Sequence, residues 1–326
     1  MPANDRMPCV WSRRSLLVAL AAGSVAALSG CRVQLDAGAP HIPLVPTRVP
    51  MQDEKTLLAV LGGSTALESL AKAVGGAPTS ITGRLNAVHA TQVGVITRLL
   101  RDGGVPQSLI GASATPGPTA PATGAVVSSA VVSSAVVSPA VLSAAESDST
   151  RDVSLAGFSN AHVALIGSML AQRIAAVTLL GGTAARIVPF GLRGAEVVRM
   201  LEAARAAVYG FEIVAAQIDG GGRALAMSTL AVLRNRAAEL ETLVGSSAAP
   251  PPLGYELPFP VTDPPGARRL ALHLLEALLT RQAAALEPAT GDTAALATLV
   301  PWLGATEAMA FPWGAPLTAF PGLTSG

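Results

Sequence analysis

Apolar residues recur every three or four positions along most of the chain beyond residue 53, which is the spacing of one face of an α-helix. The first half of the chain contains runs of this kind that are each stopped by a pair of glycines. They extend from Glu54 to Val74, from Ile81 to Leu99 and from Val163 to Leu180. The pattern therefore predicts three helices before Gly182.

The second half of the chain contains four more helical runs. They extend over Val197–Ile218, Ala226–Val244, Asp263–Glu287 and Leu296–Ala310. Asp263 followed by Pro264 is typical of a helix start, because the carboxylate accepts from free amides and proline lacks only a dispensable N–H there. No pair of strands is indicated, so we expect an all-α fold. The last four helices, with a proline-rich crossover at 250–260, have the layout of a four-helix bundle preceded by a smaller three-helix unit.

Two segments beyond the first 30 residues lack this periodicity. Residues 31–52 contain four prolines and are expected to be a tether. Within 111–150, Ala-Val-Val-Ser-Ser repeats with a period of five, which matches neither a helix nor a strand. We interpret this segment as a disordered low-complexity insertion. A membrane span is the alternative, since about 20 residues here carry no charge. The insertion divides the N-terminal helical unit into 53–110 and 151–182, and the bundle is expected over 193–323.

The N-terminus carries features of export and lipidation. Arg13 and Arg14 stand in Ser-Arg-Arg-Ser-Leu-Leu, which resembles a twin-arginine export signal, and an uncharged stretch follows to Gly30. Leu28-Ser29-Gly30-Cys31 resembles a lipobox, in which the cysteine thiol receives a diacylglyceryl group. A short buried helix is the alternative. We therefore expect residues 1–30 to be a signal peptide and Cys31 to anchor the mature protein to the extracytoplasmic face of the cell membrane.

The composition is half apolar with only 13% charged residues, about half the usual charged fraction. The net charge is +1 and no basic cluster occurs, which argues against a nucleic-acid partner. Part of the apolar excess belongs to the signal peptide and the Val/Ser repeats. The remainder is largely alanine and leucine at helical spacing, as in tightly packed helical bundles.

Several strings in the last third of the chain resemble one particular family. They are A-A-V-Y-G-F at 206–211, Y-E-L-P-F-P-V-T-D-P at 255–264 and A-F-P-G-L at 319–323. Together they are similar to a ferritin-like domain family of unknown function found in twin-arginine-exported actinobacterial lipoproteins. The resemblance covers about residues 195–323. It implies a ferritin-like four-helix bundle, and it implies no established activity.

A ferritin-like di-iron centre needs glutamates and Glu-x-x-His pairs that converge inside the bundle. No glutamate in this chain is followed by histidine three residues later. The family resemblance implies Glu-His at two positions that are Ala204 and Arg205 here. We therefore expect no cofactor, with iron or manganese as the alternative. The remaining candidate metal ligands are Glu68, His89, His162 and Glu307.

Glu307 lies on the apolar stripe of the last helix, where an unpaired charge would be costly. We expect it to form a structural ion pair with Arg205; Arg236 and Arg281 are other possible partners. The pair would replace a lost metal site.

The motifs G-x-S-x-G, G-x-x-x-x-G-K-[ST] and H-E-x-x-H are absent. The sequence therefore favours a lipid-anchored helical envelope protein with a binding or structural role. Its expected partners are the membrane, through lipidated Cys31, and an unidentified protein or small molecule. One alternative is a metal-dependent oxidase or metal-storage protein. Another is an apolar-ligand carrier with a cavity among Val208, Phe211, Leu270 and Leu274.

Overall fold

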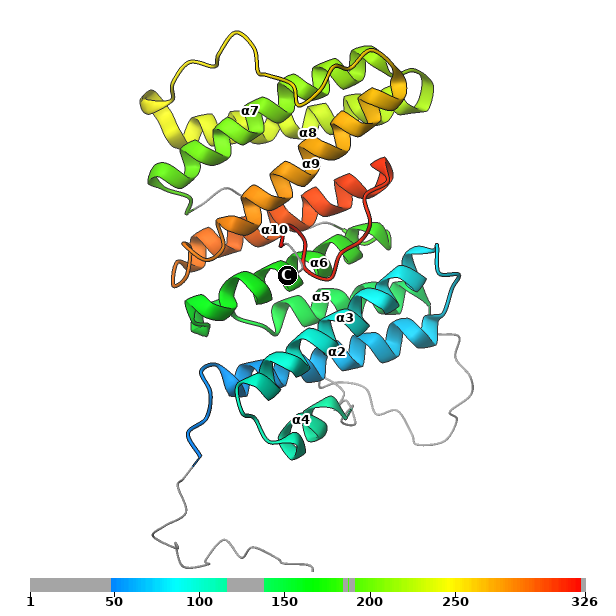
Figure 1. Ribbon diagram of the computed structural model, residues 1–326, viewed down its shortest axis with the longest axis vertical. Coiled ribbons are helices and arrows are strands. Elements are labelled where there is room, and N and C mark those ends of the chain that lie inside the picture. The colour runs from blue at the N-terminus through cyan, green and yellow to red at the C-terminus, as the bar shows by residue number, and fades with distance from the viewer. Residues whose placement is uncertain (1–47, 116–137, 184–186, 188–190, 324–326) are drawn as a thin grey trace, which may run out of the picture. The chain divides into compact units, whose positions relative to one another are not determined.

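The computed structural model in Figure 1 describes residues 48–115, 138–183, 187 and 191–323. Contacts divide the chain into Met1–Val49 and Pro50–Gly326, and the second unit holds every described helix. The described residues form nine α-helices and three short 3-10 helices, with no strand among them. The all-α prediction is therefore confirmed for this part of the chain.

The N-terminal group of helices is built around four long or medium helices. These are α2 (Glu54–Val74), α3 (Ile81–Asp102), α5 (Pro139–Arg151) and α6 (Asn160–Leu179). Helix α2 packs against α3 and α5, and α6 packs against the same two helices, so the four surround a common interior. A short helix, α4 (Gln107–Ala114), covers α2 from outside.

The sequence predicts three N-terminal helices and an insertion over 111–150. Both predictions are wrong, because two additional helices, α4 and α5, occupy the two ends of that segment. Helix α4 extends to Ala114, and α5 begins at Pro139, which occupies the first turn where proline is tolerated. Leu142 of α5 is fully buried and packs in one cluster with Leu67 and Leu85. The predicted disorder of residues 116–137, which hold most of the Val/Ser repeats, concerns residues outside those that the structure describes.

The C-terminal group contains the four helices that the sequence predicts. They are α7 (Gly194–Gln217), α8 (Gly220–Val244), α9 (Pro264–Ala284) and α10 (Thr293–Ala310). Helix α7 packs against α8 and α9, and α9 packs against α10. Helix α8 reaches α10 through long side chains: Arg236 donates to Thr306 Oγ1 at 3.2 Å and its guanidinium lies 5.0 Å from the centre of the Trp302 ring. The expected cap of α9 is present, since Asp263 accepts from the Gly266 amide at 2.7 Å.

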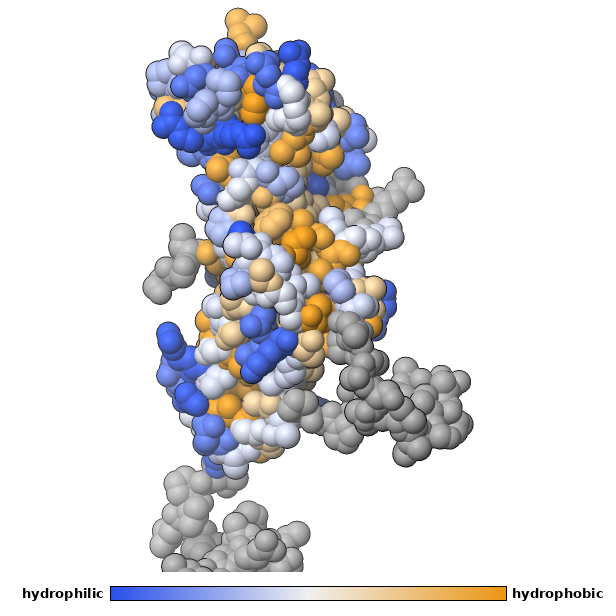
Figure 2. All heavy atoms as spheres, turned by 90° about the vertical axis from the view of Figure 1, so that its right-hand side faces the viewer, coloured by the Kyte–Doolittle hydropathy of each residue, from blue (hydrophilic) through white to orange (hydrophobic). Residues whose placement is uncertain are grey.

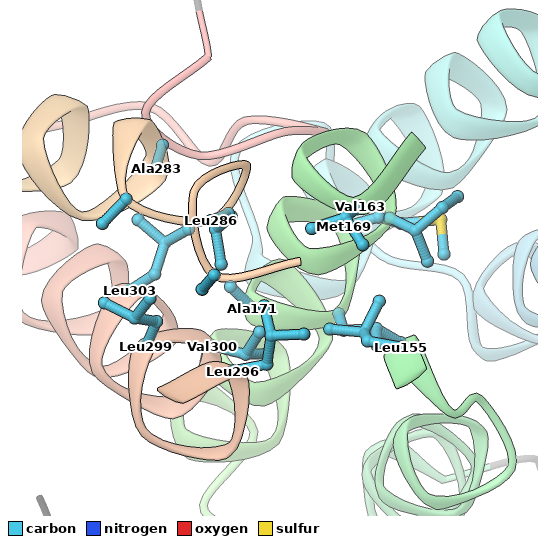
Figure 3. Close-up of a cluster of buried hydrophobic side chains, with 14 of the residues drawn as sticks. Leu155, Val163, Met169, Ala171, Ala283, Leu286, Leu296, Leu299, Val300 and Leu303 are labelled. Carbon is cyan, nitrogen blue, oxygen red and sulfur yellow. The ribbon is translucent and has the colours of Figure 1, made fainter. Parts of the chain in front are cut away.

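The two groups meet where α6 lies against α10 (Figure 1). Gly304 of α10 permits this close approach, because a Cβ there would lie 2.4 Å from the Ala171 carbonyl oxygen. Figure 3 shows side chains of α6, of α10 and of the turn after α9, including Leu286 and Leu303, pointing toward one another in this core. The large core is therefore shared between the two groups.

Three segments are long and apolar enough to cross a membrane, judged by length and composition: Glu54–Val74, Asn160–Leu179 and Thr293–Trp313. In the second and third, 67% of the most apolar window is buried inside the protein. A helix that is buried on most sides is apolar all round. The apolar composition of α6 and α10 therefore agrees with their place in the interior of the protein. On the face shown in Figure 2, polar side chains are plentiful over the end formed by α7 and α8.

The chain after α10 forms a short 3-10 helix, η3 (Phe311–Trp313), and then reverses at Gly314, whose φ of 104° favours glycine. We call residues 315–323 the C-terminal segment. It lies on α9, where a Cβ on Gly322 would be 2.2 Å from the Leu279 carbonyl oxygen. It also reaches the N-terminal group, because Ser168 of α6 donates to the Pro321 carbonyl at 2.7 Å.

Candidate functional site

Glu307 is a buried carboxyl group in the apolar helix α10, with 2% of its surface exposed. Its Oε1 accepts from the backbone amide of Thr318 at 2.9 Å and from the Thr318 hydroxyl at 3.1 Å. Its Oε2 is buried and has no hydrogen-bond partner within the described part of the chain. Burial raises the pKa of the Glu307 carboxyl to about 7, although the two bonds from Thr318 oppose this shift.

Glu307 lines a pocket of about 160 Å³ between α9, α10 and the C-terminal segment. Its other lining residues are Glu276, Leu279, Thr280, Ala310, Ala315, Pro316, Thr318, Gly322 and Leu323. A cavity of about 150 Å³ holds a molecule the size of benzene. Two of the lining residues are acidic and none of them is basic. The arrangement can hold a small molecule that offers a hydrogen-bond donor or a positive charge.

The sequence around the pocket explains its geometry. Trp313 is anchored in the core and donates to Thr229 at 3.3 Å, and Gly314 then turns the chain back. Gly322 has a φ of 73° and lies too close to α9 for any side chain. These two glycines place Thr318 beside Glu307.

Two larger pockets have no unpaired buried charge among their described lining residues. A pocket of about 340 Å³ beside α5, α6 and α10 has no charged side chain among the lining residues that the structure describes. A pocket of about 390 Å³ beside α7 and α8 holds charged residues that already pair with one another: Arg205 with Glu241 at 2.8 Å, and Arg234 with Glu212 at 2.6 Å. Glu307 therefore marks the strongest candidate site.

The expected ion pair of Glu307 with Arg205 is wrong. Arg205 lies on the side of α7 that faces α8, pairs there with Glu241 and donates to the Ala249 carbonyl at 2.7 Å. Arg236 makes its contacts with Thr306 and a tryptophan ring instead of with Glu307. The burial of Glu307 could be predicted from its place on the apolar stripe. Its hydrogen-bond partner, Thr318, could not be predicted, because it comes after the chain reversal at Gly314.

A second set of buried polar side chains lies among the N-terminal helices. This buried network consists of His89, Gln92, Glu146, Gln172 and Arg173, each of them at most 1% exposed. His89 Nε2 lies 2.7 Å from Glu146 Oε1. Gln92 Nε2 donates to Gln172 Oε1 at 2.9 Å and to the Ala319 carbonyl at 3.1 Å. The network therefore extends from α5 through α3 and α6 to the C-terminal segment.

The hydrogen bonds determine where the protons of His89 lie. The Gln92 amide nitrogen faces two acceptors, so its amide oxygen is the atom that lies 3.2 Å from His89 Nδ1. This oxygen can only accept, so Nδ1 carries a proton. His89 Nε2 and Glu146 then share a second proton, either as imidazolium with carboxylate or as imidazole with carboxylic acid. In both forms the His89–Glu146 pair has no net charge.

Arg173 brings a positive charge into the same interior. It donates to Ser64 Oγ at 2.8 Å. Burial lowers the pKa of Arg173 to about 10, and the nearby Glu146 opposes this shift. A buried guanidinium beside the carboxyl group is unfavourable for a cationic metal.

The four candidate metal ligands do not come together. His162 binds Asp53 at 2.8 Å and thereby joins the start of α6 to the start of α2. Glu68 is half-buried on α2, while His89 pairs with Glu146 and Glu307 lies on α10. Within the described residues, no group of three or more His, Cys, Asp or Glu side chains could hold a metal ion. The residues present do not fit a ferritin-like di-iron centre, which needs several converging carboxylates.

The remaining expected features are the apolar carrier cavity and the N-terminal export and lipidation residues. Phe211 and Leu270 are fully buried in a packed core with partly buried Leu274 and Val208 around it, and of the four residues expected to form a carrier cavity Val208 lines the pocket beside α7 and α8. Arg13, Arg14 and Cys31 lie outside the described residues.

Comparison with known proteins assigns part of the chain to a family model. Residues 197–325 match the model described as a domain of unknown function (DUF4439). The match covers the C-terminal helices and includes both Glu307 and Thr318. No curated protein and no solved structure matches the chain. The match agrees in position with the family resemblance over 195–323, and it brings no activity with it.

Proposed function

We propose that this protein is a lipid-anchored helical binding protein of the cell envelope and that the Glu307 pocket holds its ligand. The observation that carries the binding role is the unpaired, buried Oε2 of Glu307 in a residue that lines a pocket. A buried polar atom without a partner costs about 1–3 kcal/mol. Leucine at this position would avoid that cost, so a ligand that pairs with Oε2 explains the carboxyl group.

The proposed anchor rests on the sequence. The twin arginines, the uncharged stretch and Cys31 stand in the order that export followed by lipidation requires. Two acyl chains, each stabilised by about 0.8 kcal/mol per buried methylene, would hold the protein on the membrane.

We also propose that α7–α10 form a ferritin-like bundle without its metals. Its support is the long connection between α8 and α9, which is the crossover that such bundles use. Metal analysis of protein matured in its own host tests this proposal. Iron or manganese at one or more equivalents per chain would favour the oxidase or storage alternative.

The anchor is tested in cells by labelling with palmitate and by inhibiting lipoprotein signal peptidase with globomycin. We expect labelled protein whose processing is blocked by globomycin, and we expect Cys31→Ala to abolish labelling. Unlabelled protein released from the membrane would overturn the anchor.

The binding role is tested on the full-length lipoprotein in detergent micelles. Ligand-observed NMR with benzyl alcohol, benzylamine and benzoate covers a neutral, a cationic and an anionic probe of suitable size. We expect at least one probe to bind, and we expect Ala315→Leu, which fills the pocket, to block it. A circular dichroism spectrum and melting temperature like those of the unmodified protein would show that the variant is folded.

A further inference from the structure

We infer that the ligand of the Glu307 pocket is a small primary ammonium ion with an apolar body about the size of a benzene ring. This inference rests on the proposed function, since it names the chemical class of the ligand for the same pocket.

The charge of the pocket excludes anions. Its described lining residues include the carboxyl groups of Glu307 and Glu276 and no lysine, arginine or histidine. An anionic ligand would meet two like charges with no cation to offset them. A cationic ligand supplies the charge that the lining lacks.

The hydrogen bonds of Glu307 select the form of the cation. Oε1 is already occupied by both donors of Thr318, which leaves one acceptor, Oε2. An ionised carboxylate can only accept, so the ligand has to donate. A primary ammonium donates to a single oxygen as a compact point charge, whereas a guanidinium binds best to both oxygens at once.

Other cations fit less well. A quaternary ammonium has no N–H group and is recognised by aromatic rings, and none of the lining residues is aromatic. Calcium takes about six to eight oxygen ligands, whereas most of this wall is apolar. Leu279, Ala310, Ala315, Pro316 and Leu323 form that wall and would contact the body of an organic amine.

The charged groups around Glu307 give binding a pH dependence. Helix α9 contributes Glu276, which is exposed, and the C-terminal segment contains no titratable side chain. Arg236 of α8 binds Thr306, the neighbour of Glu307. Because burial raises the pKa of the Glu307 carboxyl to about 7, the ionised form that an ammonium needs becomes dominant only above that pH. Amine binding should therefore strengthen from pH 6 to pH 8.

The test compares the three probes on the full-length lipoprotein in micelles by titration calorimetry or ligand-observed NMR. At pH 8 we expect benzylamine to bind at least about tenfold more tightly than benzyl alcohol, since a charge-assisted bond replaces a neutral one. We expect benzoate not to bind. The neutral variant Glu307→Gln should lose at least about tenfold in benzylamine affinity and keep its affinity for benzyl alcohol. The matched control Glu276→Gln, at an exposed position of the same pocket, should lose much less.

Any one of three results would overturn the inference. If benzyl alcohol binds as tightly as benzylamine and Glu307→Gln changes neither affinity, the ammonium class is wrong while the pocket still binds a ligand. If none of the three probes binds, both the ammonium class and the proposed binding role fail. The pH dependence of benzylamine binding to the unmodified protein is an independent measurement: affinity that is flat from pH 6 to pH 8 would also overturn the inference.

Discussion

Replacing Glu307 by glutamine should make the protein more stable at alkaline pH and leave its stability almost unchanged near pH 5. Glutamine is nearly isosteric with glutamate and keeps an oxygen that can accept from Thr318. Its amide nitrogen takes the place of Oε2 and cannot ionise. The prediction therefore isolates the cost of a charge at this buried position.

The magnitude follows from the pKa of the Glu307 carboxyl, which is about 7 in the folded protein against an ordinary value of 4.5. Between these values the folded state binds more protons than the unfolded state, so the free energy of unfolding falls as the pH rises. Each pKa unit corresponds to about 1.4 kcal/mol, so the full difference is about 3 kcal/mol. Between pH 5 and pH 8, Glu307 alone should remove about 2–3 kcal/mol from the stability.

Urea denaturation of both proteins at pH 5 and pH 8 measures this effect. The other titrating groups are common to both proteins, so they cancel when the stability change of the variant is subtracted from that of the unmodified protein. We expect the unmodified protein to lose about 2–3 kcal/mol more than Glu307→Gln on going to pH 8. A difference below about 1 kcal/mol, or a difference of opposite sign, would show that the carboxyl is hydrated or paired with a cation.

Three further substitutions test the packing, two of them against a matched control. Leu142→Ala should cost about 2–5 kcal/mol in urea denaturation, because the side chain is fully buried in the N-terminal core; a cost near zero would contradict the placement of α5. Glu146→Ala should cost about 3–5 kcal/mol, because it leaves His89 buried without the carboxyl group that it pairs with. Its control, Asp148→Ala, breaks an exposed ion pair on the same helix and should cost less than about 1 kcal/mol. Gly322→Ala should lower the melting temperature more than Gly291→Ala: both glycines have positive φ, but only the first has no room for a Cβ, so equal shifts would refute the close contact with α9.

The sequence predicts most of the helices because their apolar spacing and their stops are local. The starts of α2, α3 and α9 agree with the predicted starts, and Asp263 caps α9 as its position before Pro264 suggests. Helix α5 is missed because it follows the Val/Ser repeats, and several of its buried positions are polar. Ser143 and Glu146 are buried there beside Leu142, so no apolar stripe distinguishes the helix from its surroundings.

The candidate site is predictable only in part, for a similar reason. The burial of Glu307 follows from its neighbours on one helix, which are close in the sequence. Its contact with Thr318 depends on the reversal at Gly314, and the pairing of His89 with Glu146 joins residues 57 positions apart. No periodic pattern encodes contacts of this kind, since they depend on how separate helices pack.

The contacts of the C-terminal segment bear on the order in which the protein folds. This segment is synthesised after all nine described helices, yet Ala319 and Pro321 supply acceptors to Gln92 and Ser168 in the N-terminal group. Until it emerges from the ribosome, the first helices keep polar groups without these partners and α9 keeps an uncovered surface. The N-terminal group therefore takes part of its hydrogen bonding from the region that matches the family model, and we expect both groups of helices to reach their final stability only after the C-terminal segment has been synthesised.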